Sequence, residues 1–444
     1  MTPERVRIGL LGCGNVGAAL VELIEGRRDA IAARTGVLLE VTRVAVRSLA
    51  KERPVVLPDG VLTLDAAGLV VDPDVDLVVE VIGGIEPARE LVLAALKAGK
   101  PVVTGNKELL ANVGADLFAA AAEAGVDLLF EAAVAGGIPF IRPLRESLAG
   151  ERIDRIMGIV NGTTNFILTR MTEEGASYAD ALSEAQSLGY AERDPTADVE
   201  GHDAAAKAAI IASIAFGVRV VAGDVYDEGI SRVTAADIEY AAKMGYVVKL
   251  LAIAEQHEAP AHGVDAAPGH GGEVAVRVHP AMVPKDHPLA SVRDSFNAIF
   301  VEGAAVGDLM FYGRGAGGTP TASAVLGDVI DAAVNRTRNS HATIGALAKA
   351  RIRPIDEVES AYYLNLDVFD RPGVLAAVAG VFGDHDVSIR SMEQEGLGGE
   401  ARLVFITHVA REAAVQATIR DLHHLDSVDR ITSVLRVVGP GGER

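Results

Sequence analysis

The sequence contains almost no cysteine and no long apolar run. Cys13 is the only cysteine among 444 residues, so no disulfide can form within the chain. No apolar run approaches the roughly 20 residues that cross a bilayer, and the N-terminus carries no charged region followed by a small-residue cleavage site. Together these absences predict a cytoplasmic enzyme with no membrane partner.

Basic residues are also scarce relative to acidic ones. The chain has 41 Lys and Arg against 61 Asp and Glu, a net charge of −20. Such a charge repels the phosphate backbones of nucleic acids and anionic membrane surfaces, so no nucleic-acid partner is expected. An anionic ligand would have to be bound by local positive groups.

The first part of the chain alternates short apolar strands with helices. A length of 444 residues is enough for two or three domains, and the alternation predicts a parallel sheet covered by helices on both faces. Helices are expected over 16–34, 87–99 and 108–124. The expected strands lie between them, over 6–11, 38–46, 76–84, 100–106 and 126–134.

The pattern changes after about residue 138. A strand over 152–162 leads into helices around 164–173, 177–188, 202–216 and 235–244, and strand-like runs dominate 246–312. The Gly-, Pro- and His-rich stretch 255–273 interrupts those runs and predicts an exposed loop. Its histidines, His257, His262 and His270, lack the spacing of metal ligands.

A second glycine-rich turn, 313–318, precedes a long helix with Thr319 as the expected N-cap and Pro320 at its first position. A linker follows around residues 349–360. The last 80 or so residues then predict strand, helix, strand, strand, helix, strand. This is the ferredoxin-like order, so we expect a separate C-terminal domain.

The stretch GLLGCGNVGAAL joins the first strand to the first helix. Its glycines have G-x-G-x-x-G spacing, which is weak on its own but is typical of a dinucleotide-binding loop between a strand and a helix. The glycines permit a tight turn and let backbone N–H groups approach a pyrophosphate. The expected cofactor contacts here are Gly12, Gly14, Asn15, Val16 and Gly17. Cys13 is interpreted as a small filler residue, since no base is evident nearby.

The second strand is not followed by the Asp or Glu that would bind the ribose 2′-hydroxyl of NAD. Instead it leads to Arg47, with Lys51 nearby. A guanidinium offers paired N–H donors to a phosphate, so these residues favour the 2′-phosphate of NADP. The alternatives are a pair of solvated cations, and NAD as the cofactor.

Residues 189–207, GYAERDPTADVEGHDAAAK, place five carboxylates ahead of one lysine. Glu192, Asp194 and Asp198 lie in an expected loop, and Asp203 and Lys207 share one face of the next helix at i and i+4. The cluster could bind a metal, form a solvated loop, or hold a substrate ammonium. It lacks the spacing of an EF-hand, and spacing alone does not choose among these alternatives.

Two lysines could serve a hydride-transfer reaction. The transfer to a carbonyl leaves an oxyanion that an ammonium can protonate or stabilise. Lys107 lies at the carboxyl end of an expected parallel strand, where such sheets bind ligands. Lys207 belongs to a largely apolar helix, and its pairing with Asp203 is as compatible with a structural role as with a functional one.

These motifs resemble the homoserine dehydrogenase family. The similarity is carried by AQSLGYAERDPTADVEGHDAAAK (185–207), GIVNGTTNFIL (158–168), TGNKELL (104–110), FEAAVAGGIP (130–139) and GRGAGGTPTASAV (313–325). The tail resembles an ACT domain through DRPGVLAAVAGVF (370–382). No aspartate kinase domain precedes these motifs, so the chain resembles the monofunctional form.

The resemblance implies an α/β organisation in four parts. These are a Rossmann NAD(P)-binding domain, an α+β catalytic and dimerisation domain, a helix returning to the nucleotide-binding domain, and a ferredoxin-like ACT regulatory domain, over 1–138, 139–318, 319–350 and 358–444. It also implies reversible reduction of L-aspartate 4-semialdehyde to L-homoserine, on the route to threonine, methionine and isoleucine. A homodimer or homotetramer is expected, with an interface in 246–312.

The resemblance also implies roles for the site residues. Glu192 and Asp203 would contact the substrate, with Asp198 close by; Lys207 would donate the proton, with Lys107 near the reacting oxygen. Additional cofactor contacts would come from Thr104, Lys107, Gly189 and Gly315. A monovalent cation, usually Na⁺, would be bound by Glu131, Val134, Gly136 and Ile138. Threonine would inhibit through contacts near 370–374 and 388–391, unless the ACT domain serves only oligomerisation.

Two rival functions use the same motifs. Another amino-acid-pathway dehydrogenase is possible, although aspartate semialdehyde dehydrogenase would need a catalytic cysteine and Cys13 lies in the cofactor loop. A regulatory protein that senses NADP and an amino acid is the rival from a different class. The presence of Lys107, Glu192, Asp203 and Lys207 argues against such a sensor.

Overall fold

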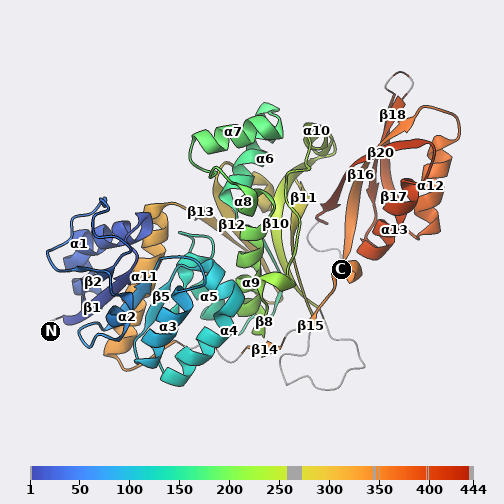
Figure 1. The fold of residues 1–444 in the computed structure, drawn as a ribbon. Coiled ribbons are helices and arrows are strands. Elements are labelled where there is room, and N and C mark those ends of the chain that lie inside the picture. Colours follow the sequence, from blue (N-terminus) through green and yellow to red (C-terminus); the bar gives the residue numbers. More distant parts are fainter. Residues whose placement is uncertain are drawn as a thin grey trace.

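The computed structural model describes residues 3–257, 273–342, 344, 347–349, 351–396, 398 and 400–439. Three parts lie in a row, with the N-terminal part at one end and the C-terminal part at the other (Figure 1). No helix among these described residues is long and apolar enough to cross a membrane. The expected loop 255–273 falls mostly outside the described residues, and so do His262 and His270.

The N-terminal part is a six-stranded parallel sheet in the order β3-β2-β1-β4-β5-β6. Its strands are β1 (Glu4–Leu11), β2 (Val37–Ala45), β3 (Leu62–Thr63), β4 (Leu77–Glu80), β5 (Val102–Thr104) and β6 (Leu128–Leu129). Its helices are α1 (Asn15–Thr35), α2 (Ala66–Val71), α3 (Ala88–Lys97) and α4 (Lys107–Ala124). This is the Rossmann order, which binds dinucleotides at the carboxyl ends of the strands. The predicted fold of this part is therefore confirmed.

One predicted strand is wrong in extent. The apolar run 126–134 forms only β6, and residues Glu131–Ala133 form the 3₁₀ helix η1. The Glu131 side chain turns back to accept backbone N–H groups at the start of α5 (Ile141–Arg145). This local cap competes with extension of the strand, and apolar content alone did not indicate it.

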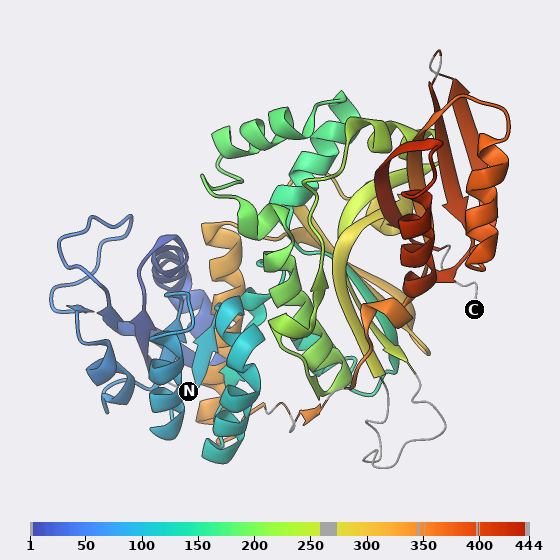
Figure 2. The same cartoon turned by 45° about the vertical axis from the view of Figure 1, so that its right-hand side comes forward.

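The middle part is a curved antiparallel sheet with helices on one face (Figure 2). The strands are β7 (Ile153–Ile159), β10 (Tyr246–His257), β11 (Glu273–Pro284), β12 (Phe296–Gly303) and β13 (Gly307–Arg314). The helices are α6 (Gly162–Glu174), α7 (Tyr178–Ser187), α8 (Thr196–Val199), α9 (His202–Phe216) and α10 (Ala235–Lys243). Short elements complete it: β8 (Val218–Arg219), η2 (Ala222–Asp224), β9 (Tyr226–Asp227) and η3 (Pro288–Ser291). His257 ends β10, so it does not belong to the predicted loop.

Helix α11 (Gly318–Thr337) returns to the N-terminal part and packs against α1. Its buried residues, Ala322, Val325, Val329 and Ala333 among them, share one apolar core with β1 and β2. The predicted cap is wrong by two residues, because Gly317 is the N-cap and Thr319 already lies inside the helix. The glycine-rich turn therefore runs directly into the helix.

The C-terminal part has the predicted βαββαβ order and the sheet order β20-β16-β18-β17. Its elements are β16 (Glu359–Phe369), α12 (Val374–Asp384), β17 (Ile389–Gly396), β18 (Glu400–Thr407), α13 (Glu412–Leu422) and β20 (Val428–Val437). Four short elements precede or join it: β14 (Ala348–Lys349), β15 (Arg351–Ile352), η4 (Ile355–Glu357) and β19 (Ala410–Arg411). Helices α12 and α13 cover one face of the sheet, where Leu364 and Phe382 are buried.

The C-terminal sheet is continuous with the middle one. β20 pairs in parallel with β11 through Ala281↔Arg436 and Met282↔Val437. Tyr363, Val404 and Leu435 join the core of the middle part, not the core beneath α12 and α13. The domain is thus docked by both hydrogen bonds and buried apolar surface.

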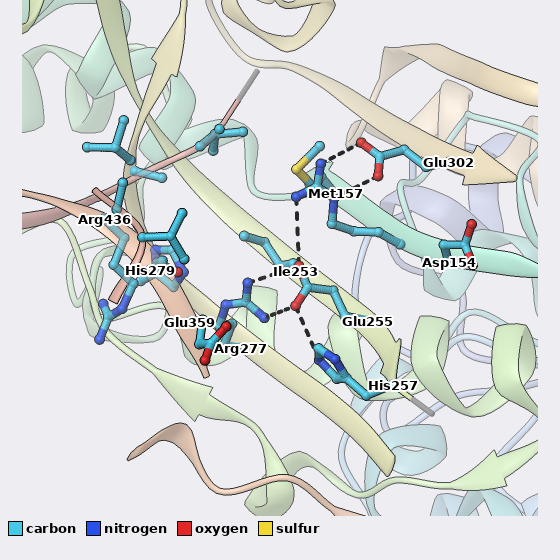
Figure 3. Close-up of a pocket in the computed structure, with 18 of the residues that line it drawn as sticks. Asp154, Met157, Ile253, Glu255, His257, Arg277, His279, Glu302, Glu359 and Arg436 are labelled. Carbon is cyan, nitrogen blue, oxygen red and sulfur yellow. Dashed lines mark hydrogen bonds and ion pairs between the residues drawn. The ribbon is translucent and has the colours of Figure 1, made fainter. Parts of the chain in front are cut away.

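The face of the middle sheet away from the helices carries a ladder of charged side chains. Glu302, Arg155, Glu255 and Arg277 come from the neighbouring strands β12, β7, β10 and β11 and alternate in sign. Figure 3 shows this face, a wall of a cavity of about 690 Å³ that extends to Glu359 and Arg436. Burial would raise the pKa of Glu255, but Arg277, His257 and Arg155 together outweigh it and lower that pKa. These charges are therefore mainly paired with one another.

Candidate active site

The turn between β1 and α1 is shaped to receive an anion. Gly12 has a φ of +99°, and a Cβ at Gly17 would lie 2.3 Å from the Gly12 carbonyl oxygen. A Cβ at Gly14, in contrast, would have nothing within 4 Å. Gly14 is the N-cap of α1 and supplies no side-chain cap, so N–H groups of the first turn, including those of Asn15 and Val16, stay available to a ligand.

Cys13 lies within this turn. Burial raises the pKa of its thiol, although Arg53 opposes the shift. A thiol with a raised pKa is a poor nucleophile, which agrees with its interpretation as a filler.

The loop after β2 presents Arg47 and Lys51 to solvent. The Arg53 guanidinium donates to the backbone carbonyls of Ser48 and Lys51, the latter at 2.7 Å, and so orders the loop. Both Arg47 and Lys51 are exposed, and neither side chain has a hydrogen-bond or ion-pair partner within the described chain. Two free cations therefore stand beyond the end of β2.

A buried carboxylate ties together the ends of β4 and β5. Glu80 accepts a hydrogen bond from the Thr104 hydroxyl at 2.5 Å and from the backbone N–H of Ile82 at 2.8 Å. Thr104 in turn accepts from the Asn106 N–H at 3.1 Å, and Asn106 caps α4 through Leu109 N–H. Thr104 as a whole is 0% exposed, so its hydroxyl serves this buried network. The network fixes the residue that begins α4, Lys107.

Lys107 and Lys207 meet on one carboxylate, that of Asp203. The Lys107 ammonium pairs with one oxygen of Asp203, and the Lys207 Nζ lies 2.7 Å from the other. Lys207 also donates to the Val160 carbonyl oxygen at 2.7 Å. Its side chain is 11% exposed and that of Lys107 is 41% exposed, so Lys107 has the greater freedom to move.

The electrostatics of this triad are set by burial and by mutual attraction. Burial would raise the pKa of Asp203, but Lys207 and Lys107 outweigh it and hold that pKa well below the usual range. Burial lowers the pKa of Lys107, but attraction to Asp203, with smaller contributions from Asp198 and Glu108, reverses the effect and raises that pKa. Asp203 therefore remains ionised and Lys107 remains charged near neutral pH.

Three other carboxylates of the acidic stretch differ in their hydrogen-bond partners. Asp194 accepts from the N–H and the hydroxyl of Thr196, at 3.2 and 2.7 Å, and so orders the loop. Asp198 accepts from the Asn161 amide at 2.7 Å. Glu192 is exposed and its carboxylate has no partner within the described residues. No group of three or more His, Cys, Asp or Glu among the described residues could hold a metal ion, which leaves the metal-cage alternative without support.

Two further glycines border the site. Gly189 has a φ of +77° and is exposed at the end of α7. Gly315 is buried, and a Cβ at Gly136 would lie 2.1 Å from the Gly315 carbonyl oxygen. The turns 131–138 and 313–318 are therefore in direct backbone contact, so the predicted cation ligands lie beside one predicted cofactor contact.

The predicted cation site contains one carboxylate and several backbone carbonyl oxygens that could act as ligands. The Glu131 carboxylate accepts from the N–H groups of Phe140, Ile141 and Arg142 at 2.5, 2.7 and 2.9 Å. Burial nevertheless raises its pKa, and a cation alongside would favour its charged form. Within the described residues no hydrogen bond ends on the carbonyl oxygens of Val134, Gly136 or Ile138. The donor set of one carboxylate and several carbonyls fits a hard cation.

Sequence reasoning missed Glu80 and Asn161. Glu80 ends an apolar strand, and the motif around Asn161 was matched without a role for that residue. A polar residue at or near the carboxyl end of a buried strand is the signal that could have indicated either one.

Comparisons with known proteins cover nearly the whole chain. Family models for "Homoserine dehydrogenase, NAD binding domain", "Homoserine dehydrogenase" and "ACT domain" match residues 12–131, 139–330 and 362–426. The homoserine dehydrogenase of Corynebacterium glutamicum is 53% identical over 433 residues, which is 97% of this chain and 95% of that protein.

Solved structures agree. A homoserine dehydrogenase from Thiobacillus denitrificans is 42% identical with a TM-score of 0.90 and covers 98% of both chains. A hyperthermophilic archaeal homoserine dehydrogenase in complex with NADPH is 30% identical with a TM-score of 0.59, covering 74% of this chain and 98% of its own. The paired lysines beyond the carboxyl end of β5 and these matches lead to one conclusion: the chain belongs to the homoserine dehydrogenase family, oxidoreductases that act on a CH–OH group.

Proposed function

We propose that the enzyme reduces L-aspartate 4-semialdehyde to L-homoserine with NADPH, reversibly, in threonine, methionine and isoleucine biosynthesis. The observation that carries the proposal is the meeting of Lys107 and Lys207 on Asp203. It lies beyond the carboxyl end of β5, where a Rossmann sheet binds its ligand. The composition and the reaction are those of a cytoplasmic biosynthetic enzyme.

The lysines supply the proton that the reduction needs. NADPH, when bound, supplies the hydride to the aldehyde carbon, and the carbonyl oxygen gains the negative charge. Lys207 donates a proton to that oxygen, and its contact with the Val160 carbonyl aims the ammonium. Lys107 lies near the same oxygen and stabilises the developing charge. In the oxidative direction Lys207, deprotonated, accepts the hydroxyl proton.

The carboxylates hold the amino-acid end of the substrate. Glu192 is exposed and unpaired within the described chain, so it is free to bind the substrate ammonium. Asp203 has both oxygens occupied by lysines, and the more exposed Lys107 is the one that a substrate would displace. Asp198 completes this side of the site.

The test is homoserine-dependent reduction of NADP⁺ at alkaline pH, which favours release of the proton. We expect turnover with L-homoserine and none with a substrate analogue that lacks the α-amino group, because the carboxylates bind that group. Cofactor binding without turnover would refute the proposal and favour a sensor.

The cofactor contacts proposed are Gly12, Gly14, Asn15, Val16, Gly17, Thr104, Lys107, Gly189 and Gly315, with Arg47 and Lys51 at the 2′-phosphate. The exposed, unpaired cations after β2 and the NADPH complex of the archaeal relative support NADP over NAD. We expect Arg47→Ala to lower the NADP/NAD ratio of kcat/KM by about tenfold, the order of a charge-assisted hydrogen bond. An unchanged ratio would end this assignment.

A monovalent cation such as Na⁺ is proposed at the turn 131–138. Glu131 and the carbonyl oxygens of Val134, Gly136 and Ile138 would hold it. The cation would stabilise the turn that packs against Gly315, and it takes no part in hydride or proton transfer. A higher melting temperature in Na⁺ than in a bulky organic cation, lost in Glu131→Gln, would support it.

Feedback inhibition by threonine is proposed through the ACT domain, with contacts near 370–374 and 388–391. The sheet of this domain is hydrogen-bonded to β11. A structural change caused by effector binding could therefore be transmitted to the catalytic part through the continuous sheet. Because truncation after about residue 355 would expose that interface, Asp370→Asn in the full chain is the better test. Unchanged threonine sensitivity would count against these contacts. A homodimer or homotetramer is expected.

A further inference from the structure

Asn161 occupies an unusual position between the strand and the helix nearest the two lysines. It follows β7, has extended backbone angles and serves as the N-cap of α6. The residue is 5% exposed. A Cβ at the next residue, Gly162, would lie 2.7 Å from the Ser295 carbonyl oxygen, so the backbone here is firmly packed.

The amide of Asn161 uses its full hydrogen-bonding capacity. Its oxygen accepts from the backbone N–H and the hydroxyl of Thr164, at 2.9 and 3.0 Å. Its nitrogen donates to Asp198 at 2.7 Å and to Asp203 at 2.9 Å. A backbone N–H only donates and an ionised carboxylate only accepts, so the orientation of the amide is fixed by chemistry.

From this geometry we infer that Asn161 is a positioning residue for the reaction: it holds Asp198 and Asp203 together on one nitrogen and thereby aims Lys207 and Lys107. The inference rests on the proposed roles of these lysines. Two carboxylates this close repel each other, and a shared N–H₂ group is a neutral way to keep both in place. The preceding residue contributes as well, since Val160 fixes Lys207 directly.

Other polar groups in the site cannot replace this amide. The Asp203 carboxylate otherwise bonds only to the two lysines, which must move a proton or yield to substrate. The Asp198 carboxylate has no other hydrogen-bond partner within the described residues. Without the amide, Asp203 would keep its lysines but Asp198 would be released.

Two variants separate this role from capping of the helix. Asn161→Ser and Asn161→Asp both keep a side-chain oxygen that can cap α6, but the serine lacks the amide and the aspartate adds a carboxyl. We expect each to lower kcat/KM for homoserine by about tenfold or more at pH 8, with NADPH affinity within about twofold of wild type. Thr164→Val is the matched control. It removes the hydroxyl bond to the Asn161 amide oxygen and leaves both bonds that the Asn161 nitrogen donates, so its kcat/KM should stay within about threefold of wild type.

The pH dependence gives a readout that a merely structural role would not move. The group introduced by Asn161→Asp faces Asp198 on α8, Asp203 and Lys207 on α9, and Lys107 on α4. When protonated, it can donate one hydrogen bond to a neighbouring carboxylate, as the amide does. The ratio of variant to wild-type kcat/KM should therefore rise between about pH 8 and about pH 5.5, whereas the Asn161→Ser ratio should stay flat.

The outcomes decide the inference separately from the proposed function. Wild-type kcat/KM in Asn161→Ser, or a flat ratio in Asn161→Asp, would overturn the inference. If the wild type fails to oxidise homoserine, the proposed function is refuted, and melting temperature then tests the inferred contacts of Asn161. The difference in melting temperature between Asn161→Asp and wild type should narrow as pH decreases. A difference independent of pH would overturn the inference.

Discussion

At the scale of single residues, the site depends on contacts that chain spacing reveals only in part. Asp203 and Lys207 are four apart on one helix, so their pairing could be predicted and is confirmed. Lys107 joins them from 96 residues away, and no local pattern carries that information. The amide of Asn161 was equally invisible, because its partners are brought to it by α8 and α9.

Lys249 is a buried lysine that the proposed reaction does not use. It is 2% exposed, and its ammonium donates to the side-chain oxygen of Asn165 and to the Val292 carbonyl. Burial lowers its pKa to about 8. Because the folded state disfavours the charged form, stability is greatest above the unfolded pKa of about 10.4 and falls as pH drops to about 8.

Lys249→Met should reveal this cost. The variant loses two hydrogen bonds at every pH but gains relief from the buried charge at neutral pH. Its free energy of unfolding relative to wild type should therefore be more favourable at pH 7 than at pH 10, by about 1–3 kcal/mol. Denaturant unfolding at the two pH values measures this difference. A difference independent of pH would show that Lys249 titrates normally.

At the scale of elements, order was predictable and boundaries were not. The alternation of strands and helices gave the Rossmann part, and the βαββαβ order gave the C-terminal part. The strand expected over 126–134 was wrong because Glu131 caps α5, a choice made by three hydrogen bonds across nine to eleven residues. Hydrophobic pattern does not register such polar competition.

The two ends of the dinucleotide loop should respond differently to a methyl group. A Cβ at Gly14 meets open space, whereas one at Gly17 collides with the Gly12 carbonyl. We expect Gly14→Ala to melt within a few degrees of wild type but to bind NADPH at least about tenfold more weakly, because the methyl occupies the path of the pyrophosphate. Gly17→Ala should lower the melting temperature itself. Normal NADPH affinity in Gly14→Ala would place the cofactor elsewhere.

At the scale of the whole molecule, the C-terminal domain is attached more firmly than a tethered module. Its order of elements could be predicted, but the pairing of β20 with β11 could not, since the two strands lie about 150 residues apart in the chain. Arg436 on β20 bonds across the junction to Glu228 and within its own domain to Glu412 of α13, both at 2.9 Å. Its guanidinium also stacks over the Tyr226 ring at 5.2 Å.

Arg436→Met should therefore destabilise both the C-terminal domain and its junction with the middle part. Removing one partner of a buried pair leaves Glu412, which is 2% exposed, with an uncompensated charge, at a cost of about 3–5 kcal/mol. Arg430→Met on the same strand is the control, because Arg430 pairs with Asp367 but is 65% exposed, so its loss should cost about 0–1 kcal/mol. Denaturant unfolding followed by circular dichroism measures the free energy of unfolding of both variants. Equal losses in the two variants would contradict the stabilising role assigned to Arg436.

The central claim is that Lys207, held by Asp203 and the Val160 carbonyl, transfers the proton. The most direct measurement is the rate of NADPH oxidation with L-aspartate 4-semialdehyde by Lys207→Met, beside its NADPH affinity. Lys243→Met is the matched control, since Lys243 pairs with Glu239 at i and i+4 on an exposed helix face. We predict that kcat falls by about 10²–10⁴ in Lys207→Met, with NADPH affinity and the control unchanged. A kcat within about threefold of wild type would contradict the account.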